Sequence, residues 1–220
     1  MPPRRSAAQR PTVVLLVRHG RTPTTGAVLP GRAAGLHLSD EGRAQAESVA
    51  GRIAESASGR GRSVAAVYAS PLERTVETAR PIARALGLAV RRHRGLLECD
   101  FGEWTGRPLR ELVRERSWQT VQYAPASFRF PGGESFTELS ARMAGTLEGL
   151  AATHPGETVV AVSHADPIKA AVAGAAGTPL DLFQRLVVSP CSVSALAIGS
   201  GGIHVLCVNS TASLAELAIS

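Results

Sequence analysis

The apolar positions of this chain fall into short continuous runs and into helical periods, and the two patterns alternate. Residues 12–17 consist only of Thr, Val and Leu, which is typical of a strand buried on both faces of a sheet. Residues 158–162 have the same character, and residues 63–69 predict another strand. Each of these runs is followed by polar or turn-forming residues, so we expect each strand to end there.

Helical patterns occupy the stretches between these strands. Ser39 can cap a helix whose first turn is acidic and whose apolar period continues to Ile53. Residues 72–86 predict a second helix that ends at Gly87, and we expect Pro81 to kink it. The chain therefore begins as strand, loop, helix, strand and helix.

The second half of the chain continues the alternation. Residues 88–97 are more polar, but they predict a further strand. We expect a loop over residues 98–107 and a short helix that Pro108 can start. The remaining predicted elements are helices over residues 134–152 and 167–174 and strands over residues 187–198 and 203–208.

Strands that alternate with helices predict an α/β fold. We expect three layers, α/β/α, with a mainly parallel central sheet and helices on both faces. The sequence shows no internal repeat and no linker between two domains. Residues 12–220 are therefore predicted to form one catalytic domain, and residues 1–11 a disordered basic tail.

Composition narrows the class of protein only slightly. Apolar residues make up 44% of the chain, and the formal net charge is +6. Lys169 is the only lysine, so arginine carries nearly all of the positive charge. Arginine suits two-point contact with phosphate, although a biased base composition would explain its abundance equally well. No aromatic-rich sheet face or recognition helix is evident, and we expect no nucleic-acid partner.

The sequence also bears on where the protein acts. The N-terminal segment MPPRRSAAQRP lacks the apolar stretch of a signal peptide, and no apolar run is long enough to cross a bilayer. Cys99, Cys191 and Cys207 are odd in number and widely spaced, which argues against disulfides and against a metal finger. We therefore expect a cytoplasmic protein that has no membrane partner.

Polar residues gather where the predicted strands end. In open α/β sheets, ligands bind outside the carboxyl ends of the strands, so separate segments should deliver these side chains to one edge. The residues concerned are Arg18 and His19, Ser70 and Arg74, Glu98, and Ser163 and His164.

These residue types favour chemistry on a phosphoryl group. Arginines and backbone amides at strand ends bind phosphate oxygens. Two histidines supply either a nucleophile with a polarising partner or two metal ligands. A zinc site would need three clustered ligands, and the arginines would repel the cation. We therefore expect no metal and no cofactor.

In chain order, the segments LLVRHGRT, SPLERTVETA, LLECDFGEWTG, GGES and VSHADPIKA resemble the motifs of the histidine phosphatase superfamily. That group includes the cofactor-dependent phosphoglycerate mutases. This chain is more similar to the short bacterial members, which are described as phosphatases or phosphomutases. The similarity spans roughly residues 13–195, and ordered motifs at predicted strand ends are far more specific than one RHG tripeptide. The resemblance implies the phosphoglycerate-mutase-like α/β fold.

The resemblance also implies a role for each matching residue. His19 would be the nucleophile that becomes phosphohistidine, attacking as the neutral imidazole. Arg18 and Arg74 would clamp the phosphoryl oxygens, and His164 would donate a hydrogen bond to them. Glu98 would protonate the leaving oxygen and later activate water.

Three smaller residues would complete the phosphate pocket. Thr22 and the backbone amide of Ala165 would bind phosphoryl oxygens. Many relatives have asparagine near Thr25 and glycine at the position of Ala165. Threonine offers a hydroxyl in place of an amide, and alanine keeps the amide donor but adds a methyl group.

Several assignments stay open on sequence grounds. Asp100 or Glu103 could replace Glu98 as the acid, and Asp166 could cap a helix or orient His164. Four other side chains could have either a structural or a functional role. Glu134 and Ser135 could begin a helix or line the pocket, and Trp104 and Trp118 could pack the loops or form part of a lid over the substrate.

The first functional hypothesis is a phosphatase that acts on a small-molecule phosphate ester. The second is a mutase, because residues 106–131 carry arginines that would hold a carboxylated substrate. The third, from another functional class, is a catalytically inactive protein that binds phosphorylated ligands. The intact nucleophile argues against this third hypothesis. The sequence does not identify the ester, and it leaves a homodimer open.

Overall fold

The computed structural model describes residues 10–59 and 63–212. Most of the predicted basic tail lies outside these residues. The described residues form one sheet of six strands in the order β3-β2-β4-β1-β5-β6. The strands are β1 (Thr12–Arg18), β2 (Val64–Ala69), β3 (Val90–Arg92), β4 (Thr158–Ser163), β5 (Val193–Gly199) and β6 (Gly202–Ser210).

The sheet is mixed rather than wholly parallel. The strands β3, β2, β4 and β1 run parallel, as the alternation with helices predicts. The strand β5 pairs antiparallel with β1, and β6 pairs antiparallel with β5. Only two residues separate β5 from β6, and so short a connection can join only antiparallel strands.

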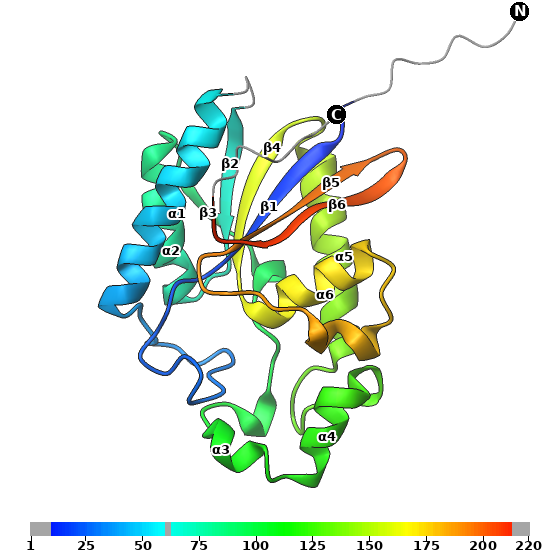
Figure 1. Ribbon diagram of the computed structural model, residues 1–220. Coiled ribbons are helices and arrows are strands. Elements are labelled where there is room, and N and C mark those ends of the chain that lie inside the picture. Colours follow the sequence, from blue (N-terminus) through cyan, green and yellow to red (C-terminus); the bar gives the residue numbers. More distant parts are fainter. Residues whose placement is uncertain (1–9, 60–62, 213–220) are drawn as a thin grey trace, which may run out of the picture.

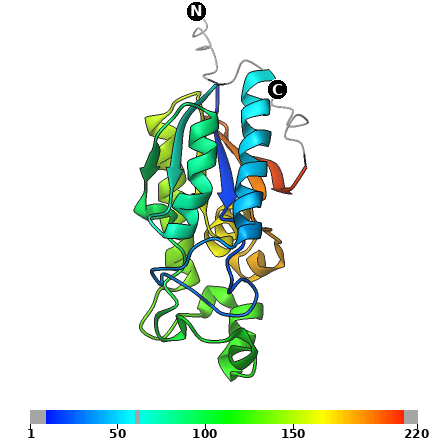
Figure 2. The same ribbon diagram turned by 90° about the vertical axis from the view of Figure 1, so that its left-hand side faces the viewer.

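Helices cover both faces of the sheet, as predicted (Figures 1 and 2). One face carries α1 (Asp40–Gly59) and α2 (Glu73–Ala85), and the other carries α5 (Phe136–Thr153) and α6 (Ala165–Ala175). Alternate residues of β1 join opposite cores: Leu15 packs on the side of α1 and α2, and Leu16 on the side of α5 and α6. Burial on both faces explains the continuous apolar run in β1.

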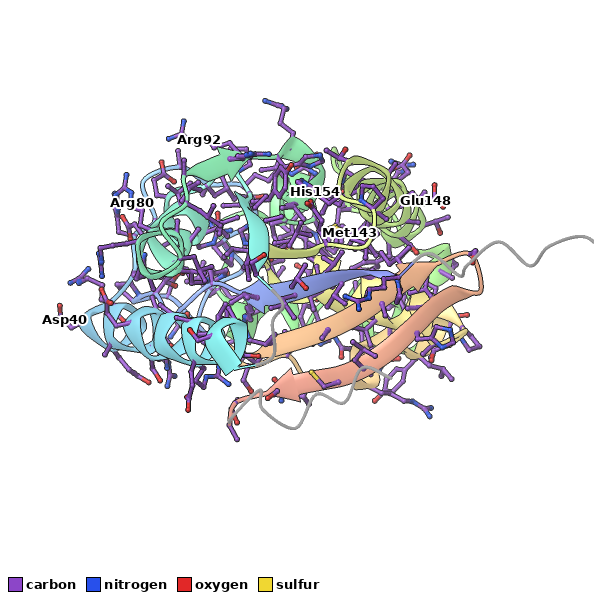
Figure 3. The ribbon with its side chains drawn as sticks, turned by 90° about the horizontal axis from the view of Figure 1, so that it is seen from above. Asp40, Arg80, Arg92, Met143, Glu148 and His154 are labelled. Carbon is purple, nitrogen blue, oxygen red and sulfur yellow. The ribbon has the colours of Figure 1, made fainter. Side chains whose placement is uncertain are left out.

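The helix α5 has one side buried against the sheet and one side exposed. Figure 3 shows Met143 pointing from α5 toward the sheet and Glu148 pointing away from it. Met143 is fully buried, whereas Glu148 is exposed. Two predicted helix starts are confirmed, near Ser39 and Ser135, whereas the helix expected from residue 167 begins two residues earlier, at Ala165. The Ser39 hydroxyl accepts from Gly42 N at 3.1 Å, and Ser135 forms a capping box with Glu138.

The predicted strand over residues 88–97 is wrong at both ends. Only Val90–Arg92 pairs with the sheet, and Arg94–Leu96 forms a 3-10 turn, η1. The chain passes close to α5 here, because a Cβ on Gly95 would lie 2.1 Å from Thr146 Oγ1. The expected strand over residues 187–198 likewise begins only at Val193, because the residues before it lie in a loop.

A segment between Glu98 and Pro131 extends beyond the carboxyl edge of the sheet (Figure 1). It contains α3 (Leu109–Leu112), which Pro108 precedes as predicted, and α4 (Arg116–Tyr123), which was not predicted. The rings of Trp104 and Trp118 stack with their centroids 6.2 Å apart, so these side chains pack the segment together. The other short turns are η2 (Gly102–Trp104), η3 (Pro125–Ser127) and η4 (Leu180–Arg185).

Within residues 10–59 and 63–212, no helix combines the length and the apolar character that a membrane crossing requires.

Candidate active site

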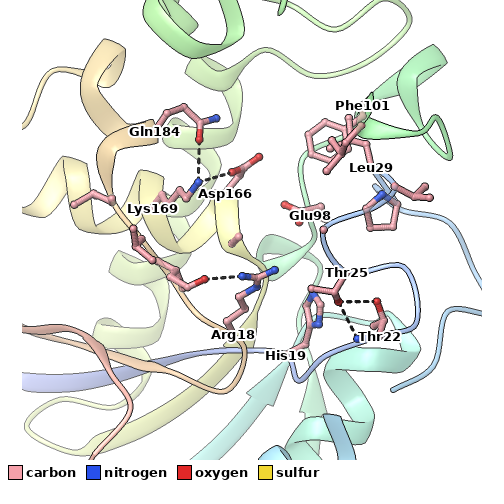
Figure 4. Close-up of a pocket in the computed structure, with 18 residues that line it drawn as sticks. Arg18, His19, Thr22, Thr25, Leu29, Glu98, Phe101, Asp166, Lys169 and Gln184 are labelled. Carbon is pink, nitrogen blue, oxygen red and sulfur yellow. Dashed lines mark hydrogen bonds and ion pairs between the residues drawn. The ribbon is translucent and has the colours of Figure 1, made fainter. Parts of the chain in front are cut away.

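The carboxyl ends of the central strands deliver the predicted polar residues to one place. His19 follows β1, Ser70 follows β2 and His164 follows β4. A cleft of about 430 Å³ opens at this edge, and its lining comes from the loops after β1, from the start of α6 and from the segment around Glu98 (Figure 4). The lining residues predicted from the sequence are Arg18, His19, Thr22, Thr25, Glu98 and Ala165.

His19 is buried at the floor of the cleft, with 6% of its surface exposed. Its Nδ1 lies 2.7 Å from the carbonyl oxygen of Gly20, which can only accept, so Nδ1 carries the proton and Nε2 keeps its lone pair. Burial lowers the pKa of His19 well below its ordinary value, and the positive charges of Arg74 and Arg18 lower it further. His19 is therefore neutral, with one nitrogen available as a nucleophile.

His164 lies beside His19, with the two ring centroids 5.2 Å apart. Its Nε2 is 2.9 Å from Ser70 Oγ, and its buried Nδ1 has no hydrogen-bond partner in the described part of the chain. Burial, followed by the charge of Arg74, lowers the pKa of His164 well below its ordinary value. If Ser70 donates to Nε2, Nδ1 keeps its proton and is a free donor next to His19.

Arg18 and Arg74 have more hydrogen-bond donors than partners. Arg74 is fully buried, and its Nη2 donates to Gly31 O at 2.7 Å. Its Nε and Nη1, like Nε of Arg18, are buried without a partner among the described residues. An unpaired buried donor costs about 1–3 kcal/mol, so such a cluster calls for an explanation. An anion bound beside His19 would satisfy these donors.

Only some of the predicted residues line the cleft. Arg18 and His19 line it, whereas Arg74 and His164 do not and lie buried behind its floor next to His19.

Thr25 Oγ1 accepts from Thr22 N at 2.9 Å and lies 3.0 Å from Thr22 Oγ1, so the two threonines form one turn. Ala165 is the first residue of α6, where backbone N–H groups lack helical acceptors and can face an anion.

Glu98 is the acidic residue, among the three considered, that lines the cleft. It is 7% exposed, and its Oε1 accepts from Cys99 N at 2.9 Å. Burial, followed by the negative charge of Asp166, raises the pKa of Glu98 to about 7. Asp100 instead accepts from Arg32 and from Gly102 N, and Glu103 is exposed outside the cleft. The geometry thus favours Glu98 as the acid.

A network that the sequence did not predict holds Glu98 in place. Arg32 Nε donates to Glu98 O at 2.8 Å, and Arg142 Nη1 donates to Leu97 O at 2.9 Å. Both arginines also pair with Oε2 of Glu134, at 3.1 and 2.8 Å. Glu134 belongs to the GGES segment, which was the only signal of this network. Its role is to position the chain around Glu98, and it does not line the cleft.

Asp166 neither caps α6 nor bonds to His164. His164 occupies the N-cap position, and its side chain makes no capping hydrogen bond. Asp166 lies in the first turn of α6, where its Oδ1 pairs with Lys169 Nζ at 3.5 Å. Lys169 Nζ also donates to Gln184 Oε1 at 2.9 Å, and all three side chains line the cleft (Figure 4).

In the part of the chain that the structure describes, no three His, Cys, Asp or Glu side chains gather as a metal site would need. The positive charges that lower the pKa of His19 are those of Arg18, which lines the cleft, and Arg74, which is buried behind the floor.

Comparison with known proteins identifies the relatives of the chain. The family model of the histidine phosphatase superfamily (branch 1) matches residues 14–211. The chain is 30% identical to phosphoserine phosphatase 1 of Hydrogenobacter thermophilus, over 92% of this chain and 94% of that protein. It is 31% identical to a probable phosphoglycerate mutase of Yersinia pestis, over 82% of each.

Solved structures share the fold as well. The chain superposes on the protein YhfR of Bacillus stearothermophilus with a TM-score of 0.81 and 26% identity, over 93% of this chain and all of the other. Some relatives are longer: the chain spans 55% of the length of the mycobacterial proteins that it matches at 33% identity.

Proposed function

This chain belongs to the histidine phosphatase superfamily, and on that premise we propose that it hydrolyses a small phosphate monoester through a phosphohistidine at His19. The observation that carries the proposal is the state of the His19 ring. Its Nδ1–H is bonded to Gly20 O, and its Nε2 is unprotonated beside guanidinium groups that have unused donors.

In the first step, the Nε2 lone pair of His19 forms a bond to phosphorus, and the bond from phosphorus to the ester oxygen breaks. The proton of the Glu98 carboxyl moves to that oxygen, so the alcohol leaves uncharged. A carboxyl with a pKa of about 7 keeps its proton in about half of the molecules at neutral pH, which suits this role. The Nδ1–H of His19 keeps its bond to Gly20 O while the ring gains positive charge.

Arg18, Arg74 and His164 stabilise the phosphoryl group during the transfer. Charge develops on its equatorial oxygens, and fixed donors aimed at them lower the barrier without reorganising. The unpartnered Nε and Nη1 of Arg74 and the free Nδ1 of His164 are donors of this kind, buried next to His19. This positive charge does the work that a metal ion would otherwise do, so we propose a metal-independent reaction.

In the second step, the Glu98 carboxylate takes a proton from a water molecule, and the water oxygen forms a bond to phosphorus. The bond between phosphorus and Nε2 breaks, and inorganic phosphate leaves. Glu98 is protonated again and Nε2 of His19 regains its lone pair, so the enzyme returns to its starting state.

Mutase activity is the second candidate, because relatives from two Yersinia species are named probable phosphoglycerate mutases. A mutase needs cations that hold a carboxylated substrate, and the arginines over residues 106–131 were the candidates for that role. Arg107 pairs with Glu115 and Arg129 with Glu138, and no arginine of this segment lines the cleft. This favours hydrolysis.

A phosphate-release screen over small metabolite esters tests the proposal, with the His19→Ala protein as the blank. Release that the blank lacks, and that persists in the presence of a chelator, supports it. A coupled assay for phosphoglycerate interconversion run in parallel detects a mutase. Binding of esters without release of phosphate or interconversion would identify a non-catalytic binder.

A further inference from the structure

The backbone of Gly20, directly after His19, is packed against the helices of one face of the sheet. The helices α1 and α2 lie side by side on this face (Figure 2). A Cβ on Gly20 would lie 2.5 Å from Gly42 O in α1, so the two backbones are in direct contact. Gly20 O, which keeps the proton on Nδ1 of His19, therefore depends on how these helices hold the peptide units around it.

Thr78 of α2 holds the first of these peptide units, which joins His19 to Gly20. Gly20 N donates to Thr78 Oγ1 at 3.1 Å, and Thr78 Oγ1 donates to Arg74 O at 2.7 Å. Thr78 is buried, and a hydroxyl can accept one hydrogen bond while it donates another. Valine has nearly the same shape but can do neither, so it would leave the buried N–H of Gly20 without a partner.

Gln45 of α1 holds the second peptide unit, which joins Gly20 to Arg21. The carbonyl oxygen of this unit faces His19 Nδ1 at 2.7 Å, and its N–H donates to Gln45 Oε1 at 3.0 Å. Gln45 Nε2 in turn donates to Glu41 Oε1 at 3.1 Å. A backbone N–H can only donate and a carboxylate can only accept, so these two partners fix which end of the Gln45 amide faces the loop.

The hydrogen bonds at the two ends of this second peptide unit support each other. A hydrogen bond donated by an amide N–H polarises the unit and increases the negative charge on its carbonyl oxygen. That oxygen accepts from the Nδ1–H of His19, and the ring gains positive charge when Nε2 bonds to phosphorus. Gln45 is therefore bonded where it favours both the Nδ1–H form of the ring and the charge that develops on it.

We infer that Gln45 and Thr78 are positioning residues for the nucleophile His19. They hold the peptide units on either side of Gly20, so that its carbonyl oxygen stays on Nδ1–H and Nε2 is free to attack phosphorus. Neither side chain lines the cleft, so both act through the backbone of the loop. The inference rests on the proposed function, because it takes Nε2 of His19 to be the nucleophile.

Nitrogen-15 NMR of labelled histidine shows which ring nitrogen carries the proton, and it needs no substrate. The chain has six histidines, and the signals of His19 are those that disappear in His19→Ala. In the wild type near neutral pH, the proton should be on Nδ1. In Gln45→Met and Thr78→Val, a measurable share of the Nε2–H form should appear. Thr78→Ser keeps the hydroxyl and should restore the signals of the wild type.

The same variants should be slower in the first step of the reaction. The ester is 4-nitrophenyl phosphate, whose leaving group needs no proton. Its kcat/KM should fall about three- to tenfold in Gln45→Met, the range that one neutral hydrogen bond corresponds to. In Thr78→Val it should fall about tenfold or more, because a buried donor loses its partner. The Kd of inorganic phosphate should stay within about twofold of wild type in Gln45→Met, and a loss of phosphate affinity as large as the loss of kcat/KM would overturn the inference.

Two control variants separate positioning from a general loss of structure. Gln119→Met changes an exposed glutamine of α4 that does not line the cleft. Thr146→Val removes a buried hydroxyl that makes the same kind of bond to a carbonyl one turn earlier, to Arg142 O at 2.7 Å. Both controls should keep the ring signals of the wild type.

The ring signals also separate a failure of this inference from a failure of the proposed function. Signals that stay in the wild-type form in Gln45→Met and Thr78→Val would overturn the inference alone. If Thr78→Val does not fold, Gln45→Met decides the question, because Gln45 is only partly buried. Failure of the wild type to release phosphate from any ester would instead contradict the proposed function.

Discussion

Nδ1 of His19 lies 2.7 Å from the carbonyl oxygen of Gly20, the next residue in the chain. This contact fixes which nitrogen carries the proton, and it leaves Nε2 as the nucleophile. The surrounding burial and the charges of Arg74 and Arg18 lower the pKa of the ring, so the neutral form persists well below pH 6.5. A single backbone contact and two arginines thus define the reactive state of the site.

The pH dependence of kcat/KM should reflect this state. Glu98 must be protonated in the first step and its pKa is raised to about 7, so activity should fall as the pH rises through about 7. His19 must be neutral and its pKa is lowered, so the acid limb should lie well below pH 6.5. Initial rates between pH 4 and 9 measure both limbs; an alkaline limb absent up to pH 9 would contradict the role of Glu98.

The substitution Glu98→Gln should lower kcat by roughly 10²–10⁴-fold on esters of poor leaving alcohols, because the amide cannot transfer a proton. The alkaline limb should disappear with it. The loss should be much smaller for 4-nitrophenyl phosphate, whose leaving group needs no proton. An equal loss on both kinds of ester would mean that Glu98 acts on structure and not as an acid.

Asp166→Asn should move the alkaline limb to lower pH. The negative charge of Asp166 raises the pKa of Glu98, and its removal lets Glu98 ionise more readily. The measurement is the pH profile of kcat/KM for glycerol phosphate, whose poor leaving alcohol needs the proton of Glu98. Asp40→Asn is the matched control, since Asp40 is exposed at the start of α1, and it should leave the profile in place. A shift to higher pH in Asp166→Asn would contradict the electrostatic account.

The unused donors of Arg74 predict that anions stabilise the fold. Inorganic phosphate at about 100 times its Kd should add about 2.7 kcal/mol to the free energy of unfolding, which corresponds to roughly 5–10 °C in Tm for a chain of this length. Sodium chloride at equal ionic strength controls for general salt effects. In Arg74→Met the phosphate-dependent shift should largely vanish. A shift of unchanged size would show that phosphate binds elsewhere.

A close backbone approach holds the loop that follows His19. A Cβ on Gly42, in the first turn of α1, would lie 2.0 Å from Arg21 O, whereas a Cβ on Gly51 in the same helix meets nothing within 4 Å. Gly42→Ala should therefore destabilise the protein by about 1–3 kcal/mol and lower kcat/KM at least about tenfold. Gly51→Ala should stabilise it by about 0.5–1 kcal/mol. Denaturant unfolding and initial rates of both variants test this; equal effects would contradict it.

The sequence predicted those parts of the fold that local patterns encode. The strand β1 is buried on both faces, so it contains only apolar residues and threonine before Arg18, and its end marks His19. The helix α4 was not predicted, because its sequence RSWQTVQY is mostly polar and only Val121 within it is buried. The strands β5 and β6 are antiparallel because only two residues connect them. The alternation of strands and helices, from which we predicted a mainly parallel sheet, takes no account of the length of a connection.

Much of the site depends on contacts between distant parts of the chain. Arg32 reaches Glu134 across 102 residues, and no local pattern links them. Lys169 and Gln184 meet because η4 folds back onto α6, so their neighbourhood in the cleft could not be predicted from either segment alone. By contrast, His19, Ser70 and His164 each directly follow a strand, and the ends of these strands can be predicted.

The central claim is that His19 carries the phosphoryl group during turnover. A rapid-quench experiment with phosphorus-32-labelled ester, followed by peptide mapping, tests it most directly. The account predicts label that is stable in alkali and labile in acid, located on the peptide that contains His19 and absent in His19→Ala. Phosphate release without any labelled protein at the shortest quench times, or undiminished turnover by His19→Ala, would contradict the account.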